Sequence, residues 1–357
     1  MRQFCEAVLR EGKTETPIMW KSAKAWLEYL YGYQKQATTD ILEASKLDGT
    51  DRMKDCARVL MLFITANQAP DTEAFNDYLA DELSWLTEME QKEADGYFYR
   101  AKTRLSHQAL MKHYQNNTDK LLALMDVTNN YHYGEYIDTM RVSQLEKYFA
   151  YTNTPAKTNL DKYLKANLKK DENAMTDLIG TKYLRLCQWD KAIKWLEYVP
   201  ASFYNEAGYR MYVLLRKVSV EPWITRQWIK DADEDRAREY NWTVSENPKL
   251  LFAKEMQMME GSLNLLQGKA LDQRYYNLAV RYAQASIHGD CWWLLRYSKS
   301  CYDNFRVNEV NLDDKALEML QKAAMTSDPA LKRKALFAMG YRELYGMTSY
   351  GQPNKKL

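Results

Sequence analysis

The chain has 357 residues but only 13 glycines and 8 prolines, and such a low content of turn-forming residues argues against β-sandwiches, propellers, glycine-rich phosphate loops and disorder. Lys and Arg total 50 and Asp and Glu total 48, so the net charge of +2 gives no sign of a nucleic-acid or other polyanionic partner. Hydrophobic residues make up 46% of the chain, which is enough apolar mass for a large core.

The N-terminal segment has no apolar core of the kind that a signal peptide needs. The longest apolar run, Val59–Ile64, is far shorter than the ~20 residues of a membrane span. The sequence as written therefore predicts a cytoplasmic protein without a transmembrane segment. A periplasmic or envelope-associated protein stays open if Met1 is the start of a trimmed chain.

Helical periodicity runs through nearly the whole chain. In residues 17–33 the side chains of Trp20, Ala23 and Leu27 recur at steps of three and four, which places them on one face of a helix. No segment shows sustained two-residue alternation, so we expect essentially no sheet. The same periodicity predicts helices over 52–66, 72–89, 97–114, 118–127, 134–150, 157–168, 172–187, 189–199, 203–217, 246–267, 271–287, 289–304, 312–325 and 329–345.

Short links join most of the predicted helices, so successive helices are expected to lie antiparallel and adjacent. A long string of such hairpins favours a helical solenoid over a compact bundle. The longest irregular stretch, 229–246, is rich in acidic residues. It is expected to be a loop or a joint between two lobes, with its charges in solvent.

One segment has a repeat-like spacing of small and aromatic residues. Counted from Asn173, the residues Gly180, Tyr183, Ala192 and Leu196 occupy positions 8, 11, 20 and 24. This segment resembles a tetratricopeptide repeat, in which small residues at positions 8 and 20 let two helices approach and an aromatic residue at 11 fills the space between them.

The spacing recurs near the C-terminus, where Ala316, Leu320 and Ala323 match positions 20, 24 and 27. The period is irregular, because the separation of Gly180 and Gly261 is not a multiple of the 34 residues of that repeat. Periodicity and resemblance together predict an all-α fold, an α-solenoid of antiparallel helical hairpins wound as a tetratricopeptide-like right-handed superhelix. We expect divergent helical hairpins in 1–168, tetratricopeptide-like repeats in 169–350 and a C-terminal tail in 351–357.

The resemblance implies a non-catalytic scaffold that binds a partner protein or peptide on the concave face of the solenoid, because the first helix of each hairpin lines that face in the family. Basic side chains there would favour an acidic or carboxylate-bearing partner segment, unless they are ordinary solvated charges. The predicted partner-binding residues are Lys182, Arg185, Arg333, Lys334 and Arg342.

Residue patterns typical of catalysis are missing from the sequence. It contains no GxSxG, GxxxxGK[ST], GxGxxG or HExxH motif, and its four histidines and five cysteines lack zinc-ligand spacing. The segment His288–Cys291 groups nucleophilic residue types, but Gly289 is expected to end one helix and Asp290 to cap the next. We therefore expect no enzyme activity, no cofactor, and no catalytic, cofactor-binding or metal-binding residues.

Aromatic residues make up 13% of the chain and gather at Tyr97–Tyr99, around Tyr131 and Tyr133, and at Trp292 and Trp293. Neighbouring residues on a helix point about 100° apart, so the members of one cluster cannot all face one interface. Such clusters pack between helices or form recognition surfaces. The second possibility leaves open an alternative function, an aromatic-rich solenoid that binds a glycan or cell-envelope ligand.

Overall fold

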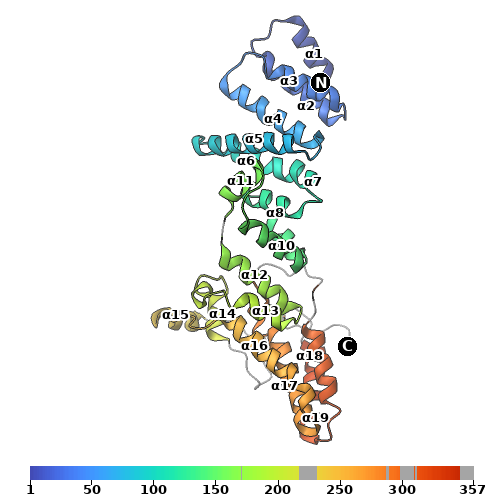
Figure 1. Ribbon diagram of the computed structural model, residues 1–357, viewed down its shortest axis with the longest axis vertical. Coiled ribbons are helices and arrows are strands. Elements are labelled where there is room, and N and C mark those ends of the chain that lie inside the picture. Colours follow the sequence, from blue (N-terminus) through green and yellow to red (C-terminus); the bar gives the residue numbers. More distant parts are fainter. Residues whose placement is uncertain (170, 217–230, 287–288, 298–308, 310–311, 346–357) are drawn as a thin grey trace. The chain divides into compact units, whose positions relative to one another are not determined.

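The computed structural model describes residues 1–169, 171–216, 231–286, 289–297, 309 and 312–345, without the side chains of 231–234 and 341–345. Helices predominate in these residues and no strand occurs among them, which confirms the predicted all-α class (Figure 1). The internal contacts divide the chain into two units, Met1–Lys170 and Asp171–Leu357. The division does not fall within 229–246, where we expected a joint. The winding of the hairpins into a right-handed solenoid stays a prediction.

The N-terminal unit is built from helices that mostly pack against their neighbours in sequence. A π-helical turn, Ser106–Leu110, joins two of them. Its helices are α1 (Arg2–Glu11), α2 (Pro17–Leu30), α3 (Gln34–Ala44), α4 (Asp51–Gln68), α5 (Glu73–Lys92), α6 (Tyr97–Leu105), α7 (Met111–His113), α8 (Thr118–Val127), α9 (Tyr133–Thr139), α10 (Val142–Asn153) and α11 (Asn159–Asn167).

Helices α2, α3 and α4 share a core of small and β-branched side chains, among them Ile18, Ile41 and Ile64. At its edge Asp40 accepts from Lys24 Nζ at 2.5 Å and lies 2.7 Å from Lys21 Nζ. Burial raises the pKa of Asp40, but the hydrogen bonds from the two lysines hold it below its ordinary value. An ion-pair cluster therefore fixes α3 against α2.

Helix α8 is the central helix of the N-terminal unit, and every residue of Leu121–Val127 is buried. It packs against α9, α10, α11 and the π-helical turn. Helix α11 also packs against α5, so contacts in this unit are not limited to consecutive helices. The N-cap residue Asn117 accepts a hydrogen bond from the Lys120 backbone N–H, which stabilises the start of α8.

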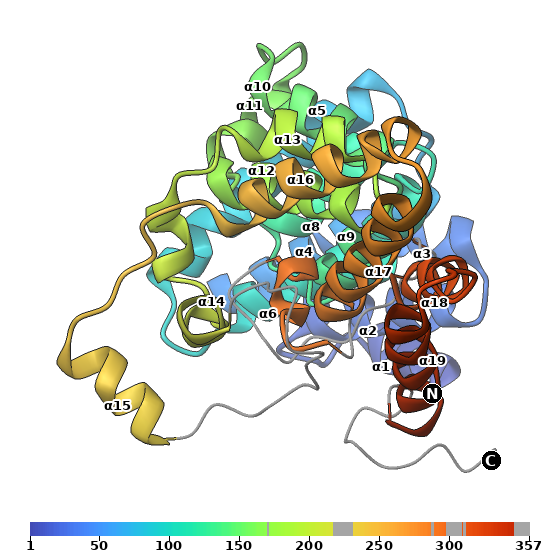
Figure 2. The ribbon, with the colours of Figure 1, turned by 90° about the horizontal axis from the view of Figure 1, so that it is seen from below.

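The C-terminal unit begins with α12 (Glu172–Arg185) and α13 (Trp189–Leu196), which pack against each other across a short link. Its other helices are α14 (Arg210–Leu215), α15 (Asp231–Glu239), α16 (Pro248–Gly261), α17 (Gly268–Ala285), α18 (Leu312–Ala323) and α19 (Pro329–Tyr345). Helix α13 packs directly against α16, and the remaining contacts run in order through α17, α18 and α19, which lie side by side in Figure 2. The segment with α14 and α15 therefore lies, in the sequence, between two helices that pack against each other.

Several predicted elements differ from the structure. Helices α1 and α3 were not predicted, and α15 occupies part of the acidic stretch expected to be a loop. In place of the helix expected over 289–304, Trp292–Leu295 forms a 3-10 turn, and residues 298–304 lie outside the described part. The Cys291 backbone N–H donates to the Gln284 carbonyl at 2.8 Å, so the chain folds back onto α17 instead of starting a helix.

Among the described residues, no helix combines the length and the apolar character needed to cross a lipid bilayer.

Candidate functional site

The five basic residues predicted to bind a partner do not share a surface. Lys182 and Arg185 are 0% and 3% exposed, so a partner on the surface cannot reach them. Arg333 and Lys334 are exposed on α19. The side chain of Arg342 lies outside the described residues.

Lys182 and Arg185 are buried because α12 is the central helix of its unit, with every residue of Thr176–Arg185 buried. Lys182 Nζ lies 2.6 Å from Glu309 Oε1, and Arg185 Nη1 lies 3.2 Å from the other oxygen of the same carboxylate. Arg185 also donates two hydrogen bonds to the Leu295 carbonyl, at 2.8 and 3.0 Å. The prediction of a basic concave surface on this helix is therefore wrong, because both side chains are buried and pair with a carboxylate far along the chain.

A second buried ion pair joins α12 to α16. Lys249 and Asp177 are both 0% exposed, and Lys249 Nζ donates to the two Asp177 carboxylate oxygens at 2.8 and 2.7 Å. Lys249 also donates to Thr181 Oγ1 at 2.7 Å and to the Arg296 carbonyl, while Tyr204 donates its hydroxyl to Asp177 at 2.8 Å. Sequence reasoning missed this pair, because no local pattern links an acid to a base so far along the chain.

Burial acts on both members of this pair. It raises the pKa of Asp177 and lowers that of Lys249 to about 8, although each group partly offsets the shift of the other. Both shifts favour the neutral forms, and the charged pair is retained by the attraction between its charges and by its hydrogen bonds. The Lys249 ammonium has no solvent-exposed surface from which to react with a substrate, and its contacts are structural.

The network positions the start of α16 and the chain around Leu295 and Arg296. At the first turn of α16, Asn247 accepts from two backbone N–H groups and donates to the Leu196 and Val199 carbonyls at 2.9 and 3.0 Å. These contacts hold the N-terminus of α16 against α13 and the chain that follows it. The same two segments carry Phe252 and Trp293, which line an open cavity.

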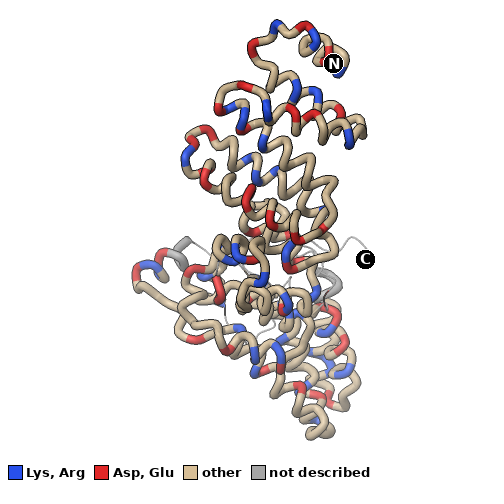
Figure 3. Tube along the Cα trace, turned by 45° about the horizontal axis from the view of Figure 1, so that its top comes forward, with Lys and Arg blue, Asp and Glu red and all other residues tan. Residues whose placement is uncertain are grey.

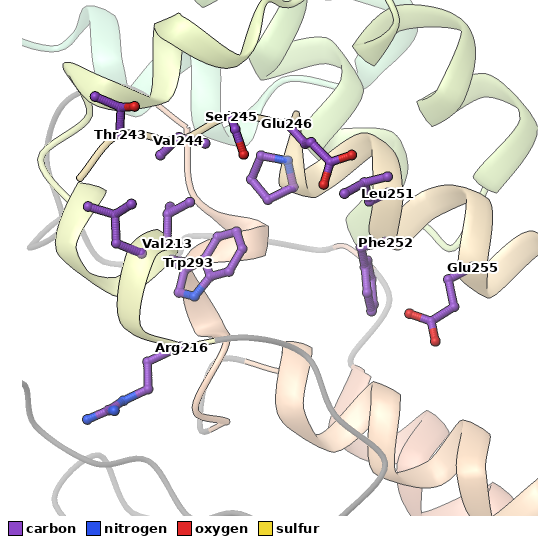
Figure 4. Close-up of a pocket in the computed structure, with 12 residues that line it drawn as sticks. Val213, Arg216, Thr243, Val244, Ser245, Glu246, Leu251, Phe252, Glu255 and Trp293 are labelled. Carbon is purple, nitrogen blue, oxygen red and sulfur yellow. The ribbon is translucent and has the colours of Figure 1, made fainter.

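This cavity, which we call the Trp293 pocket, has a volume of about 310 Å³. Trp293, Phe252 and Val213 are almost fully buried, whereas Leu251 is 49% exposed. In Figure 4 the Trp293 indole is drawn in the middle of the group, with Val213 on the α14 side and Leu251 and Phe252 on the α16 side. The lining consists of Val213, Leu214, Arg216, Thr243, Val244, Ser245, Glu246, Pro248, Leu251, Phe252, Glu255 and Trp293.

The charged residues of the Trp293 pocket are not equivalent. Glu255 Oε1 accepts from Arg281 Nε at 3.0 Å, and Arg216 Nε lies 3.4 Å from Asp290 Oδ1. Asp290 is thus an ion-pair partner and not the helix cap that we expected. Glu246 is exposed and makes no ion pair with any described residue. The pocket therefore presents an apolar interior and one exposed carboxylate.

The chain that precedes the pocket lining carries two further exposed aromatic rings. Tyr240 and Trp242 are 65% and 37% exposed, and their ring centroids lie 6.3 Å apart in a stacked arrangement. The Val244 backbone N–H donates to Asn205 Oδ1 at 2.8 Å, which fixes this segment to the body of the unit. Aromatic side chains held in this way provide contact area at low entropic cost.

The aromatic clusters noted in the sequence divide between core and surface. Trp292 and Trp293 are 2% exposed and belong to the core of the C-terminal unit. In the N-terminal unit Phe98 is buried, but Tyr99 and Tyr131 are 43% and 68% exposed. The clusters therefore do not form one row of exposed rings along the described chain.

Two further features of the described residues bear on their chemistry, the arrangement of metal-ligating side chains and the distribution of charge. Within this part of the chain, no group of three or more His, Cys, Asp and Glu side chains has an arrangement that could hold a metal ion. The residues that line the Trp293 pocket include no His and no Cys. Figure 3 shows Lys and Arg interspersed with Asp and Glu along the trace.

Comparisons of this chain with protein-family models, with curated proteins and with solved structures find no match.

Proposed function

We propose that this protein is a non-catalytic interaction module whose C-terminal unit binds a partner segment that carries an apolar side chain beside basic residues. The observation that supports this most is the Trp293 pocket, an apolar cavity of about 310 Å³ with an exposed carboxylate at Glu246. The resemblance to tetratricopeptide repeats adds to it, because proteins of that family bind other proteins.

The pocket walls suit an apolar anchor. Trp293 and Phe252 belong to well-packed elements, so they require little ordering when a ligand enters. Full burial of one Leu or Phe side chain contributes roughly 1.5–3 kcal/mol. Leu251 would cover such an anchor from the rim, where it is still half exposed without a partner. Binding energy concentrated in a few anchors of this kind is typical of protein interfaces.

The charge at the pocket determines which partner residues can lie beside the apolar anchor. Since Glu255 and Arg216 already have ion-pair partners, Glu246 is the lining charge that can pair with a ligand. A Lys or Arg beside the anchor would meet this carboxylate, whereas an Asp or Glu would be repelled. The proposed partner is therefore basic, in contrast to the acidic partner expected from the sequence.

The proposal includes no reaction. In the described part of the chain, the hydroxyl groups of Thr243 and Ser245 make no hydrogen bond to a basic side chain, so neither is activated as a nucleophile.

Fluorescence anisotropy of labelled peptides tests this function. One set of short peptides carries a central Phe or Leu flanked by Lys, and a matched set has Glu in place of Lys. We expect the full chain to bind the Lys-flanked set more tightly, and Leu251→Asp to weaken that binding about tenfold or more, as the loss of one apolar anchor contact predicts.

Met325→Asp is the matched control, because Met325 is 84% exposed in the same unit and does not line the pocket. It should bind the peptides as the parent does. If neither peptide set binds, or if Leu251→Asp and Met325→Asp bind equally well, the Trp293 pocket is not a peptide site.

A further inference from the structure

The N-terminal unit contains a polar cavity of about 510 Å³ that is independent of the Trp293 pocket. Its wall combines the loop before α5, the end of α7, the start of α8 and the first turns of α10. The residues that bear on its chemistry are Asp71, His113, Asn117, Asp119, Gln144 and Lys147. A cavity of this size is within the range of small-molecule sites.

His113 is held in one orientation and in one protonation state. Its ring centroid lies 4.6 Å from that of Phe75, and the ring hydrogen-bonds the Ala66 backbone. Nε2 is buried and has no hydrogen-bond partner among the described residues. Burial lowers the pKa of His113, so the imidazole is neutral at physiological pH. Because the other ring nitrogen donates to the Ala66 carbonyl, Nε2 is an acceptor without a donor.

Several other polar groups of this wall are only partly used by the protein. Asp71 accepts from Asn76 Nδ2 through one oxygen, which leaves its second oxygen available. Gln144 Oε1 accepts from the Arg141 backbone, so its amide N–H groups remain as donors. Asp119 and Lys147 form no ion pair closer than 4.0 Å with any described residue. The cavity thus offers acceptors at Asp71 and Asp119 and donors at Gln144 and Lys147, whereas the free nitrogen of His113 is buried beneath the wall.

The mixture of charges limits the ligand. The net charge of the lining is negative, which disfavours an anion, and the Lys147 ammonium repels a cation placed beside it. A hydroxyl group both donates and accepts, so a ligand with several hydroxyls satisfies acceptors and donors at once. Hydrogen bonds from hydroxyls to carboxylates are charge-assisted and about twice as strong as neutral ones.

From these contacts we propose that the cavity lined by Asp71, His113, Asp119 and Lys147 binds a neutral polyhydroxylated ligand, a saccharide of one or two rings. Asp71 and Asp119 accept from its hydroxyls, and Lys147 and Gln144 donate to them. The site uses polar side chains and not the exposed tyrosines, so it differs from the aromatic glycan surface considered from the sequence.

Isothermal titration calorimetry on the full chain tests the proposal. The neutral probes are the methyl glycosides of common hexoses and N-acetylhexosamines and their disaccharides. The charged comparators are glucosamine, glucuronic acid, spermidine and inorganic phosphate. We expect saturable binding of at least one neutral sugar and weaker binding of its charged counterparts. Asp119→Asn and Lys147→Met should each raise the Kd about tenfold, as the loss of a charge-assisted hydrogen bond predicts.

Glu88→Gln and Lys162→Met serve as matched controls, because both residues are exposed in the same unit and neither lines the cavity. These variants should bind as the parent does, and thermal melting should show that all four variants stay folded. The proposal is overturned if no neutral sugar binds, if a charged comparator binds more tightly than every neutral sugar, or if Asp119→Asn and Lys147→Met bind as the controls do. A test with the same sugars linked to a surface separates a glycan terminus from a free sugar as the source of the ligand.

Discussion

Lys249 and Asp177 form an ion pair from which solvent is excluded, with Nζ 2.7 Å from Oδ2 and both side chains 0% exposed. The pair connects the first helix of the C-terminal unit, α12, with α16, and Tyr204 completes the coordination of the carboxylate. It therefore links the packing of this unit to the positions of the Trp293 pocket walls. A pair of this kind tolerates the loss of both charges better than the loss of one.

Removal of one partner should be strongly destabilising. Lys249→Met leaves the Asp177 carboxylate buried without its cation, so the free energy of unfolding should fall by about 3–5 kcal/mol. The double variant Asp177→Asn with Lys249→Met should recover a large part of this loss, since no charge then remains buried. Urea denaturation followed by circular dichroism measures both effects. Lys249→Met and Asp177→Asn are also measured as single variants. If their losses in the free energy of unfolding simply add in the double variant, the two side chains do not act as a pair.

Gly180 and Leu196 show why the repeat-like spacing requires a small residue. A Cβ atom built on Gly180 would lie 2.6 Å from Leu196 Cγ, closer than carbon atoms can approach. The sequence predicted that Gly180 would face Ala192, but the nearest atoms belong to Leu196, one turn further along α13. Close approach of α12 and α13 thus depends on the absence of a side chain at 180.

Gly180→Ala should therefore destabilise the protein, in spite of the higher helix propensity of alanine. We expect a loss of about 1–3 kcal/mol from overpacking against Leu196. Gly261→Ala is the matched control, because Gly261 is also helical and its Cβ would have no neighbour within 4 Å. That variant should gain roughly 0.5–1 kcal/mol in helix propensity. Equal melting temperatures for the two variants would contradict the packing described for Gly180.

The sequence predicts the local structure well where the spacing of apolar residues along one helix determines it. Helix α4 ends and α5 begins around Pro70 as expected, with Thr72 accepting a hydrogen bond from the Phe75 backbone as the N-cap. Such features depend on residues close together in the chain, so periodicity and capping preferences suffice to find them. The missed helix α3 contains Thr38, Thr39 and Asp40, which are weak helix formers, and packing against α2 stabilises it.

The candidate sites could not be predicted in this way. Lys182 and Arg185 look like surface charges in the sequence, but both are buried and pair with Glu309, which lies in a distant part of the chain. The Trp293 pocket likewise combines α14, α16 and the chain before Leu295, and no local pattern joins these segments. Long-range pairing of charges and the formation of cavities depend on tertiary packing, which cannot be predicted from local patterns in one sequence.

Buried tyrosines should make the protein sensitive to alkali. Burial raises the pKa of Tyr114 and Tyr148 in the N-terminal unit and of Tyr204 and Tyr209 in the C-terminal unit. These groups stay protonated in the folded chain above pH 10.0, where their unfolded forms ionise. Their contribution to stability is thus complete below that pH and declines as the pH rises further.

Urea denaturation at about pH 9 and about pH 11 checks this expectation, and the midpoint should fall at the higher pH. Lys249 offsets part of this fall, because its contribution to stability rises between its folded pKa of about 8 and its ordinary value of 10.5. The several buried tyrosines outweigh this single lysine. The part of the tyrosinate absorbance that comes from the buried tyrosines should appear only together with unfolding. Full ionisation of the tyrosines in a chain that remains folded would contradict their burial.

The most direct test of the proposed function is a reversal of charge at Glu246, measured by anisotropy with the two peptide sets. Glu246 is exposed, so Glu246→Lys should leave the fold intact. The variant should bind the Glu-flanked peptides more tightly than the Lys-flanked ones, the opposite of the parent preference, and the difference should shrink as salt is added. The exposed Glu88→Lys in the N-terminal unit should keep the parent preference. If Glu246→Lys also keeps the preference for Lys-flanked peptides, the Trp293 pocket does not select a basic partner and the central claim is wrong.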